Sequence, residues 1–413
     1  MNIKEAALNA KRASKSLMTI GTQKKNEALA EICKALRENA DYILKENEKD
    51  LIKAKEKGMS SSLTDRLRLT TKRIDSMIEG VEKIIALDDP IGETLGAKQM
   101  PNGIKVSKVT VPMGLIGVIY ESRPNVTLDT AALCLKASSS VILRGGSDAF
   151  NSNKAISDVM KKAIEKAGIN PDCISFVEDT SRQVATDLMK LNGIVDLLIP
   201  RGGASLIKTV VENATVPVIE TGVGNCHIFV DKSADEDMAV NIIVNAKTSR
   251  PSVCNACESL LIHKDVKKSF YEKLYAALKE KNVEIRGCSE TMKNLSCDSL
   301  ATDEDFSTEY LDYIISVKTV NDIDEAIEHI SKYSTGHSEC IITNDYVNSV
   351  KFTNEIDSAA VYVNASTRFT DGFEFGLGAE IGISTQKLHA RGPMGLKEIT
   401  STKYIITGNG QVR

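Results

Sequence analysis

Cys254 lies in the run Arg250–Glu258, with small polar neighbours and an arginine four residues before it. Cysteine attacks as its thiolate, which requires partial exposure and an electropositive neighbourhood. The spacing to Cys257 also suits half of a zinc site or a redox pair, although none of the five His or seven other Cys supplies a second ligand pair at matching spacing. The residues alone therefore leave three interpretations of Cys254 open: nucleophile, metal ligand and packed thiol.

Two glycine pairs, Gly145-Gly146 and Gly202-Gly203, each follow an expected strand and open an expected helix. In that position backbone N–H groups and the helix dipole can face a phosphate. A G-x-G-x-x-G fingerprint is absent from this region, and single glycine turns also occur at helix ends. Because two such turns occur in successive units, the sequence favours a nucleotide-binding site.

The elements that must hold these residues begin with helices. Residues 1–90 are rich in Ala, Leu, Lys and Glu, with apolar residues at three- and four-residue spacing, which predicts helices throughout. Asn102-Gly103 then predicts a hairpin with strand-like alternation on either side. From Leu115 strands alternate with helices, and Val216–Ile219 is the expected last strand of this series. This alternation predicts a parallel sheet that binds ligands at the carboxyl ends of its strands.

A second α/β body is expected from about residue 230. We expect Asp231-Lys-Ser233 to cap a helix that runs to about Lys247, followed by the Cys254 loop and a strand at Glu258–Ile262. Further helices are expected from Asp265 and from near Asp322, and strands at residues 339–343, 360–364 and 403–406.

Length, charge and the start of the chain restrict the class of protein. A chain of 413 residues exceeds the usual size of one core, so two or more domains are expected. The net charge of −4 gives no general basic field for nucleic acid. No stretch is long and apolar enough to span a membrane, and the first residues are charged and amphipathic, which predicts a cytoplasmic protein. The nine scattered cysteines are expected to be reduced.

Six motifs in order make the chain similar to the aldehyde dehydrogenase superfamily over essentially its whole length. Within that superfamily it resembles the branch that reduces γ-glutamyl phosphate in proline biosynthesis. Two features favour that branch: Ser122-Arg-Pro-Asn125, where ordinary members carry an aromatic residue before the Asn, and the tail Ala390–Gly395. The motifs are Val118–Thr127, Val141–Ser147, Asp196–Gly203, Val218–Asn225, the Cys254 run, and Gly376–Ser384 followed by His389–Gly395.

The resemblance implies a reaction on an acyl phosphate. The Cys254 thiolate would attack the acyl carbon of L-glutamate 5-phosphate, and the oxyanion would bind the Asn125 side chain and the Cys254 N–H. Phosphate would leave, and hydride from NADPH would reduce the thioester to L-glutamate 5-semialdehyde. Without the resemblance, we would interpret Asn125 as a turn residue after Pro124. Glu220 aligns with the residue that activates water in hydrolytic relatives, so proton transfer and pocket shaping both stay open for it.

The resemblance also implies sites for the cofactor and the substrate. Glu309 aligns with the carboxylate that holds the nicotinamide ribose, although a surface charge before a strand is the alternative. Arg144 and Ser147 would hold a 2′-phosphate, with Gly202 and Gly203 at the second turn. For His337, an acid–base role and a structural role stay open. Candidates for the glutamyl carboxylate or the leaving phosphate, any of which could instead brace a loop, are Arg123, Arg250 and Arg368.

The expected fold is α/β and aldehyde-dehydrogenase-like, with two doubly wound domains plus a β-ribbon oligomerisation module. Residues 1–96 and 113–228 would form the cofactor-binding domain, to which residues 387–397 return, and residues 229–386 the catalytic domain. Residues 97–112 and 398–413 would form the ribbon and tail, which predicts a dimer or tetramer, since isolated hairpin edges otherwise invite uncontrolled pairing. A glutamate 5-kinase is a possible partner, and no metal, nucleic acid or membrane is expected.

Two other functions stay open. The presence of Glu220 leaves open the function of a hydrolytic NAD(P)-dependent semialdehyde dehydrogenase. The presence of Cys254 and Cys257 leaves open a non-catalytic regulator that binds a nucleotide or a metal.

Overall fold

The computed structural model describes residues 2–413, with Ser61 and Ser62 as backbone only. The chain divides into two compact units. The first extends to Thr221 and includes Gly376–Gly382 and Met394–Arg413, and the second comprises Gly222–Phe375 and Ile383–Pro393. The first break therefore falls seven residues before the expected end of the cofactor domain at residue 228, because the strand that contains residue 228 pairs within the second unit.

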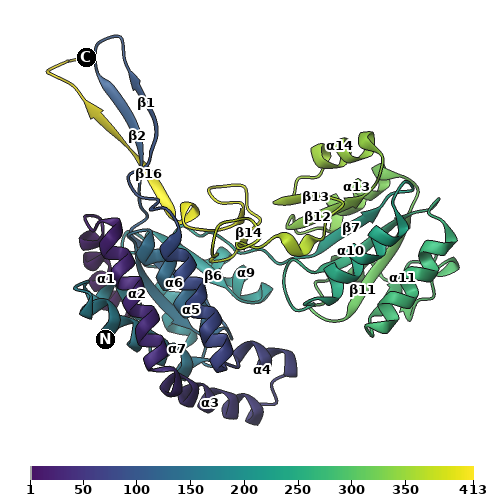
Figure 1. Cartoon of the computed structure of the whole chain (residues 1–413), viewed down its shortest axis with the longest axis horizontal. Helices are drawn as coiled ribbons and strands as arrows, with labels where there is room; N and C mark the ends of the chain where they lie inside the picture. Colours follow the sequence, from purple (N-terminus) through teal and green to yellow (C-terminus); the bar gives the residue numbers. More distant parts are fainter. Residues whose placement is uncertain (1) are drawn as a thin grey trace. The chain divides into compact units, whose positions relative to one another are not determined.

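The N-terminal helices follow the predicted pattern (Figure 1). Side chains of Asn2, Ser60 and Thr70 cap three of them, since each accepts a hydrogen bond from a backbone N–H of the first turn. The five helices are α1 (Ile3–Leu17), α2 (Thr22–Glu38), α3 (Ala40–Glu56), α4 (Ser61–Leu67) and α5 (Thr71–Ala86).

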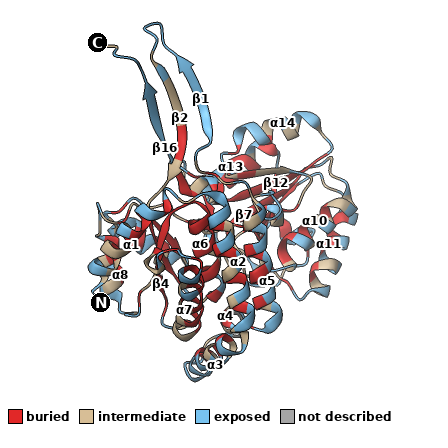
Figure 2. Ribbon diagram, turned by 60° about the vertical axis from the view of Figure 1, so that its left-hand side comes forward, coloured by how far each residue is buried: buried red, intermediate tan, exposed pale blue. Residues whose placement is uncertain are grey.

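The first unit contains a parallel sheet of four strands in the order β5-β4-β3-β6. Every residue of β3 and β4 is buried, as their apolar sequences predict (Figure 2). The strands are β3 (Leu115–Tyr120), β4 (Ser140–Gly145), β5 (Ile174–Phe176) and β6 (Leu197–Arg201), and the helices between and after them are α6 (Pro124–Lys136), α7 (Phe150–Lys166), α8 (Arg182–Met189) and α9 (Ala204–Asn213).

One predicted strand of this series is wrong. Val216–Ile219 makes only an isolated bridge to β6, at Val218, with hydrogen bonds from Leu198 N to Pro217 O and from Ile219 N to Leu198 O. Pro217 has no N–H to donate, so a continuous ladder cannot form on both sides of the segment.

A separate antiparallel sheet has the order β1-β2-β16 and extends beyond the helices of the first unit (Figure 1). Its strands are β1 (Thr94–Gln99), β2 (Lys105–Pro112) and β16 (Thr400–Thr407). The predicted hairpin is confirmed: Met100 N donates to Ile104 O at 2.8 Å, and Gly103 adopts the left-handed φ of +87° that this turn requires. The first strand begins at Thr94, three residues before the expected start of the ribbon at residue 97.

The second unit is built on a parallel sheet of seven strands in the order β10-β9-β11-β8-β7-β12-β13. Its strands are β7 (Cys226–Val230), β8 (Cys257–His263), β9 (Glu284–Gly287), β10 (Ser299–Leu300), β11 (Ile314–Val320), β12 (Ser338–Ile342) and β13 (Ala360–Val363). The helices are α10 (Glu236–Thr248), α11 (Lys268–Glu280), α12 (Asp303–Ser307), α13 (Ile323–Tyr333) and α14 (Tyr346–Glu355), and a short antiparallel pair is formed by β14 (Ile383–Ser384) and β15 (Gly392–Pro393).

The cap of α10 differs from the expected one. Asp235, rather than the Asp231–Ser233 segment, accepts the hydrogen bond from Met238 N at 2.8 Å. The Ser233 hydroxyl instead donates to the Asp231 carboxylate, within the segment that connects β7 to α10. Likewise α11 begins at Lys268, three residues after Asp265. Among residues 2–413, no helix is long and apolar enough to cross a membrane.

Candidate active site

The loop between α10 and β8 carries Cys254, which is partly exposed. Two others of the nine thiols, Cys288 and Cys297, are also partly exposed, and the remaining six are buried. Burial raises the pKa of Cys257 well above its ordinary range, so this thiol is packed and inert. Within the described chain, no group of three or more His, Cys, Asp or Glu residues is arranged to hold a metal ion.

The backbone of Cys254 is held on one side by the segment that leads into β7. The Cys226 thiol donates to the Cys254 carbonyl oxygen at 3.1 Å. A Cβ added to Gly224 would lie 1.5 Å from that same oxygen, so only glycine allows this close approach. The Val218–Asn225 motif therefore supplies a backbone surface against which the cysteine loop packs.

Arg368 braces the other side of the loop. Its guanidinium donates to the Asn255 side-chain oxygen and, from Nε, to the Ser249 hydroxyl at 3.1 Å. Asn255 in turn donates to Thr370 O at 2.9 Å. Burial lowers the pKa of Arg368, with the neighbouring charge of Arg250 acting in the same direction. Of the three roles open to Arg368, this geometry favours bracing the loop.

The charges around Cys254 are those that a thiolate needs. The groups that interact electrostatically with Arg368 include Arg250 and the Cys254 thiol, and Arg250 itself is exposed. One guanidinium group, that of Arg368, thus acts electrostatically on this partly exposed thiol. Cations in this position stabilise the thiolate relative to the thiol.

Glu309 lies in the segment between α12 and β11 and is half-buried. Its carboxylate accepts a hydrogen bond from Gly224 N at 2.8 Å. Gly224 is the residue whose backbone packs against Cys254. The structure therefore brings Cys254 and Glu309 to the same glycine, which the sequence alone did not indicate.

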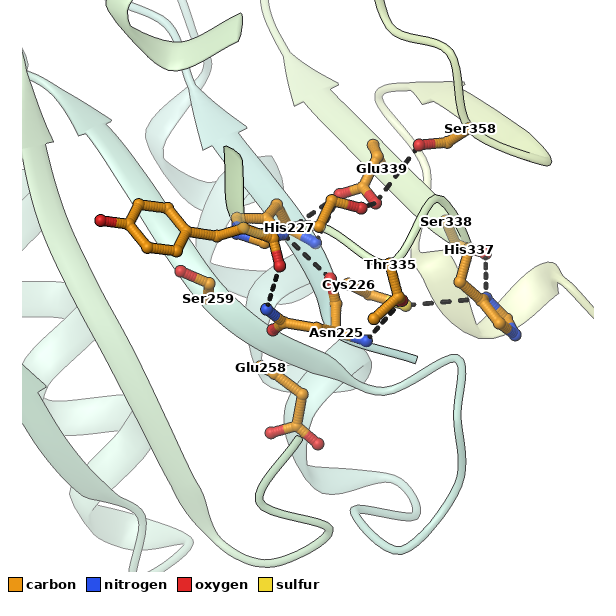
Figure 3. Close-up of polar contacts among 12 residues, drawn as sticks. Asn225, Cys226, His227, Glu258, Ser259, Thr335, His337, Ser338, Glu339 and Ser358 are labelled. Carbon is orange, nitrogen blue, oxygen red and sulfur yellow. Dashed lines mark hydrogen bonds and ion pairs between the residues drawn. The ribbon is translucent and has the colours of Figure 1, made fainter. Parts of the chain in front are cut away.

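His337 is fully buried next to β12. Its Nδ1 lies 2.8 Å from the Ser338 hydroxyl and 3.7 Å from the Cys226 sulfur (Figure 3). The neighbouring Glu339, also buried, accepts from His227 N at 2.7 Å. These contacts favour the structural role for His337, as part of a buried polar cluster for which the sequence carries no motif.

In the first unit, Asn125 is the second residue of α6, directly after Pro124. Its side-chain nitrogen donates to the Asp129 carboxylate at 2.9 Å. Burial raises the pKa of Asp129 to about 6, partly opposed by this hydrogen bond and by the charge of Arg201. Arg123 stands at the N-cap position of the same helix and is half-buried. The start of α6 thus presents an amide of fixed orientation.

Arg144 lies at the carboxyl end of β4, and one nitrogen of its guanidinium is hydrogen-bonded to the chain. One terminal nitrogen donates to Thr180 O at 2.6 Å and to Ser181 O at 2.9 Å. Its Nε is buried without a hydrogen-bond partner among the described residues, and burial lowers its pKa. Ser147, three residues later, is exposed.

The two glycine turns do not offer all the donors that the sequence led us to expect. Gly146 N donates to Tyr120 O at 2.8 Å, and Gly203 N donates to the Glu121 carboxylate at 3.1 Å. A Cβ on Gly202 would lie 2.4 Å from an oxygen of that same carboxylate. A phosphate at the start of α9 would therefore compete with the carboxylate of Glu121 for Gly203 N.

Glu220 is half-buried and stands immediately before Thr221, the last residue of this segment in the first unit. The Thr221 hydroxyl donates to Pro200 O at 2.8 Å, which holds the segment beside β6. The candidate residues of the first unit follow the carboxyl ends of β3, β4 and β6, the edge at which a parallel sheet binds ligands. They are Arg123, Asn125, Arg144, Ser147, Gly202 and Gly203.

Comparison with known proteins agrees with this fold. Residues 1–291 and 301–405 match the aldehyde dehydrogenase family. The chain therefore belongs to the aldehyde dehydrogenase family.

Several full-length relatives within that family are γ-glutamyl phosphate reductases. The enzyme of Clostridium botulinum (strain Alaska E43) is 59% identical over 404 residues, 98% of each chain, and that of Caldicellulosiruptor bescii is 58% identical over 413 residues, 99% of each chain. The crystal structure of γ-glutamyl phosphate reductase from Thermotoga maritima superposes with a TM-score of 0.96 at 50% identity and covers 100% of both chains. The predicted fold class is thereby confirmed.

Proposed function

We propose that this protein catalyses the NADPH-dependent reduction of L-glutamate 5-phosphate to L-glutamate 5-semialdehyde, with release of phosphate, in proline biosynthesis. The observation that carries the proposal is the full-length similarity to γ-glutamyl phosphate reductases, at 57–59% identity. The surroundings of Cys254 support it, since this partly exposed thiol interacts electrostatically with Arg368. The hydrolytic alternative has no such support among these relatives.

The first chemical step follows from the groups around Cys254. Its thiolate forms a C–S bond with the acyl carbon, the C–O bond to phosphate breaks, and phosphate leaves with the electron pair. The oxyanion that develops needs donors that are already oriented. We assign this role to the Cys254 N–H and to Asn125, whose side-chain nitrogen has one hydrogen bound to Asp129 and a second one to offer.

The residues of the first unit fit a dinucleotide that carries a 2′-phosphate. Arg144 has a buried Nε without a hydrogen-bond partner among residues 2–413, and the exposed Ser147 adds a hydroxyl donor. Bound NADPH supplies the hydride that reduces the thioester. Glu309 would accept hydrogen bonds from the nicotinamide ribose. At Gly203, the carboxylate of Glu121 suits a hydroxyl donor better than a phosphate.

The remaining assignments concern the glutamyl group and Glu220. We assign the anionic groups of the substrate to Arg123, Arg250 and Arg368, of which Arg368 also donates to Asn255 and Ser249. Glu220 would assist proton transfer or shape the pocket, since a reductase gains nothing from hydrolysing its thioester.

The reverse reaction tests the proposal without the labile acyl phosphate. Purified protein is incubated with L-glutamate 5-semialdehyde and NADP⁺, with and without inorganic phosphate, and NADPH formation is followed by absorbance. We expect formation of NADPH to require phosphate. Oxidation at the same rate without phosphate would identify a hydrolytic semialdehyde dehydrogenase. Stoichiometric zinc in a protein that forms no NADPH with or without phosphate would identify the metal-binding regulator.

The ribbon sheet supports a dimer or tetramer as the assembled form. It exposes large apolar side chains on β1 and β16, among them Leu95, Tyr404 and Ile406. Exposed apolar strands of this kind usually meet a partner. We further propose a cytoplasmic location, and transfer of the labile acyl phosphate from a glutamate 5-kinase.

A further inference from the structure

The two ends of the Cys254 loop are tied together by a buried ion pair. Lys247, in the last turn of α10, donates to the carboxylate of Glu258, the second residue of β8, at 2.5 Å. Both side chains are completely buried. This burial raises the pKa of the Glu258 carboxyl, and the charge of Lys247 opposes the shift. The pair closes the loop at its base.

Glu258 also holds a second segment. Its other carboxylate oxygen accepts a hydrogen bond from Leu311 N at 3.3 Å. Leu311 has a φ of +55°, a left-handed conformation that is unfavourable for a residue with a branched side chain. A specific contact is therefore needed to hold the backbone there. In Figure 3 the Glu258 carboxylate points away from the buried cluster around Asn225 and Glu339, so it serves this separate set of contacts.

The segment that contains Leu311 is also connected to the Cys254 loop. Glu309, two residues before Leu311, accepts from Gly224 N at 2.8 Å, and Gly224 packs against the carbonyl of Cys254. These contacts thus connect the two ends of the cysteine loop, at Lys247 and Glu258, to Cys254. Each step is a hydrogen bond, an ion pair or a backbone contact within the second unit.

We propose that Glu258, paired with Lys247, is a positioning residue that fixes the Glu309 segment against the Cys254 loop. It would thereby coordinate the group that holds the nicotinamide ribose with the thiol that carries the acyl group. The inference rests on the proposed function, because that function gives Glu309 and Cys254 their roles. A buried ion pair can often be replaced by apolar residues without loss of stability, so stability alone does not account for it.

Two matched double variants distinguish the hydrogen bond between Leu311 N and Glu258, called the link below, from the charges of Lys247 and Glu258. Lys247→Met with Glu258→Gln removes both charges but keeps a side-chain oxygen for the Leu311 N–H. Lys247→Met with Glu258→Met removes both charges and also cuts the link. A second link-cut variant, Lys247→Leu with Glu258→Leu, controls for poor packing of the methionine side chains. Thermal unfolding of each variant shows first whether it is folded.

We expect the link-kept variant to retain most of the wild-type kcat/KM. The link-cut variants should lose about tenfold to a hundredfold in kcat/KM, as small misplacements in an active site do. The loss should include a higher KM for NADPH, with little change in the KM for L-glutamate 5-phosphate. A purely structural pair would not produce this division between the two substrates. Equal activity, or equal loss, in folded link-kept and link-cut variants would overturn the proposal.

A readout without substrate keeps this inference distinct from the proposed function. The rate at which iodoacetamide alkylates Cys254 is measured by mass spectrometry in the wild type and both kinds of variant. We expect NADPH to change this rate in the wild type and the link-kept variant, and to change it much less in the link-cut variants. If the wild type shows this coupling but does not reduce the acyl phosphate, the proposed function fails and the link stands. The same NADPH effect in all variants would overturn the link.

Discussion

Asn125 donates a hydrogen bond to the carboxylate of Asp129, one turn further along α6, with 2.9 Å between the two atoms. An ionised carboxylate only accepts hydrogen bonds, so it selects the orientation in which the nitrogen of the amide faces Asp129. The side chain of Asn125 is therefore oriented before any substrate binds. This pre-organisation is what an oxyanion donor requires.

Removing the Asn125 amide should slow the chemical step. We expect Asn125→Ala to lower kcat by about 10²- to 10³-fold, as loss of one oxyanion donor does. Asp129→Asn should have a smaller effect, since the new amide can also donate and so no longer selects one orientation of Asn125. Steady-state kinetics of both variants measure this, with circular dichroism as a control for folding. An Asn125→Ala variant with wild-type kcat would remove Asn125 from the mechanism.

The raised pKa of Asp129 makes a prediction about stability and pH. In the folded protein its pKa is about 6, above its ordinary value of 3.8, so the folded state binds the proton more tightly than the unfolded state. The contribution of Asp129 to the free energy of unfolding is therefore most favourable at low pH and is lost as the pH rises through about 6. We expect the free energy of unfolding of Asp129→Asn to rise relative to that of the wild type from about pH 4 to about pH 6, and the difference to level off above that. Urea unfolding at several pH values measures the difference, and a constant difference contradicts it.

Cys254 and Cys257 should respond differently to the same substitution. Cys254→Ser should abolish turnover while NADPH still binds, because the hydroxyl is far less nucleophilic at neutral pH. Cys257→Ser is the matched control, since this thiol is buried and inert, and it should keep the reaction while it lowers stability. Activity assays and fluorescence titration with NADPH compare the two. Turnover by Cys254→Ser would exclude it as the nucleophile.

The two arginines near Cys254 should have separable roles. Arg368→Lys cannot reproduce both contacts, to Asn255 and to Ser249, so we expect a lower kcat and slower alkylation of Cys254. Arg250→Ala should mainly raise the KM for the acyl phosphate, by about tenfold or more, as loss of a charged contact does. Kinetics with varied acyl phosphate distinguish the two effects. The opposite pattern would exchange the roles of Arg250 and Arg368.

Arg144 should affect both cofactor choice and local stability. Arg144→Ala removes the donors to Thr180 and Ser181, so a lower melting temperature is expected. If Arg144 also contacts a 2′-phosphate, the ratio of kcat/KM for NADPH to that for NADH should fall by about tenfold or more, the cost of a charge-assisted hydrogen bond. Kinetics with both cofactors give the ratio. A destabilised variant with an unchanged ratio would restrict Arg144 to its structural contacts.

The sequence by itself determined the features that depend on nearby residues. Helical periodicity before residue 90, the Asn102-Gly103 turn, and the loop position of Cys254 were all predictable, because each follows from propensities and spacing within a short window. The ordered motifs also predicted the family and its reaction. The predicted fold class and family are both confirmed.

Only the tertiary structure decided which distant segments meet. Residue 228 was assigned to the first domain although its strand, β7, pairs with β8 and β12, since the choice of partner strands depends on residues far away in the chain. The carboxylate of Glu121 at Gly203 and the pairing of Lys247 with Glu258 have the same origin. A charged residue carries no local sign of whether it will be solvated or buried against a partner. The groups that could react were visible in the sequence, whereas those that hold them in place became visible only in the fold.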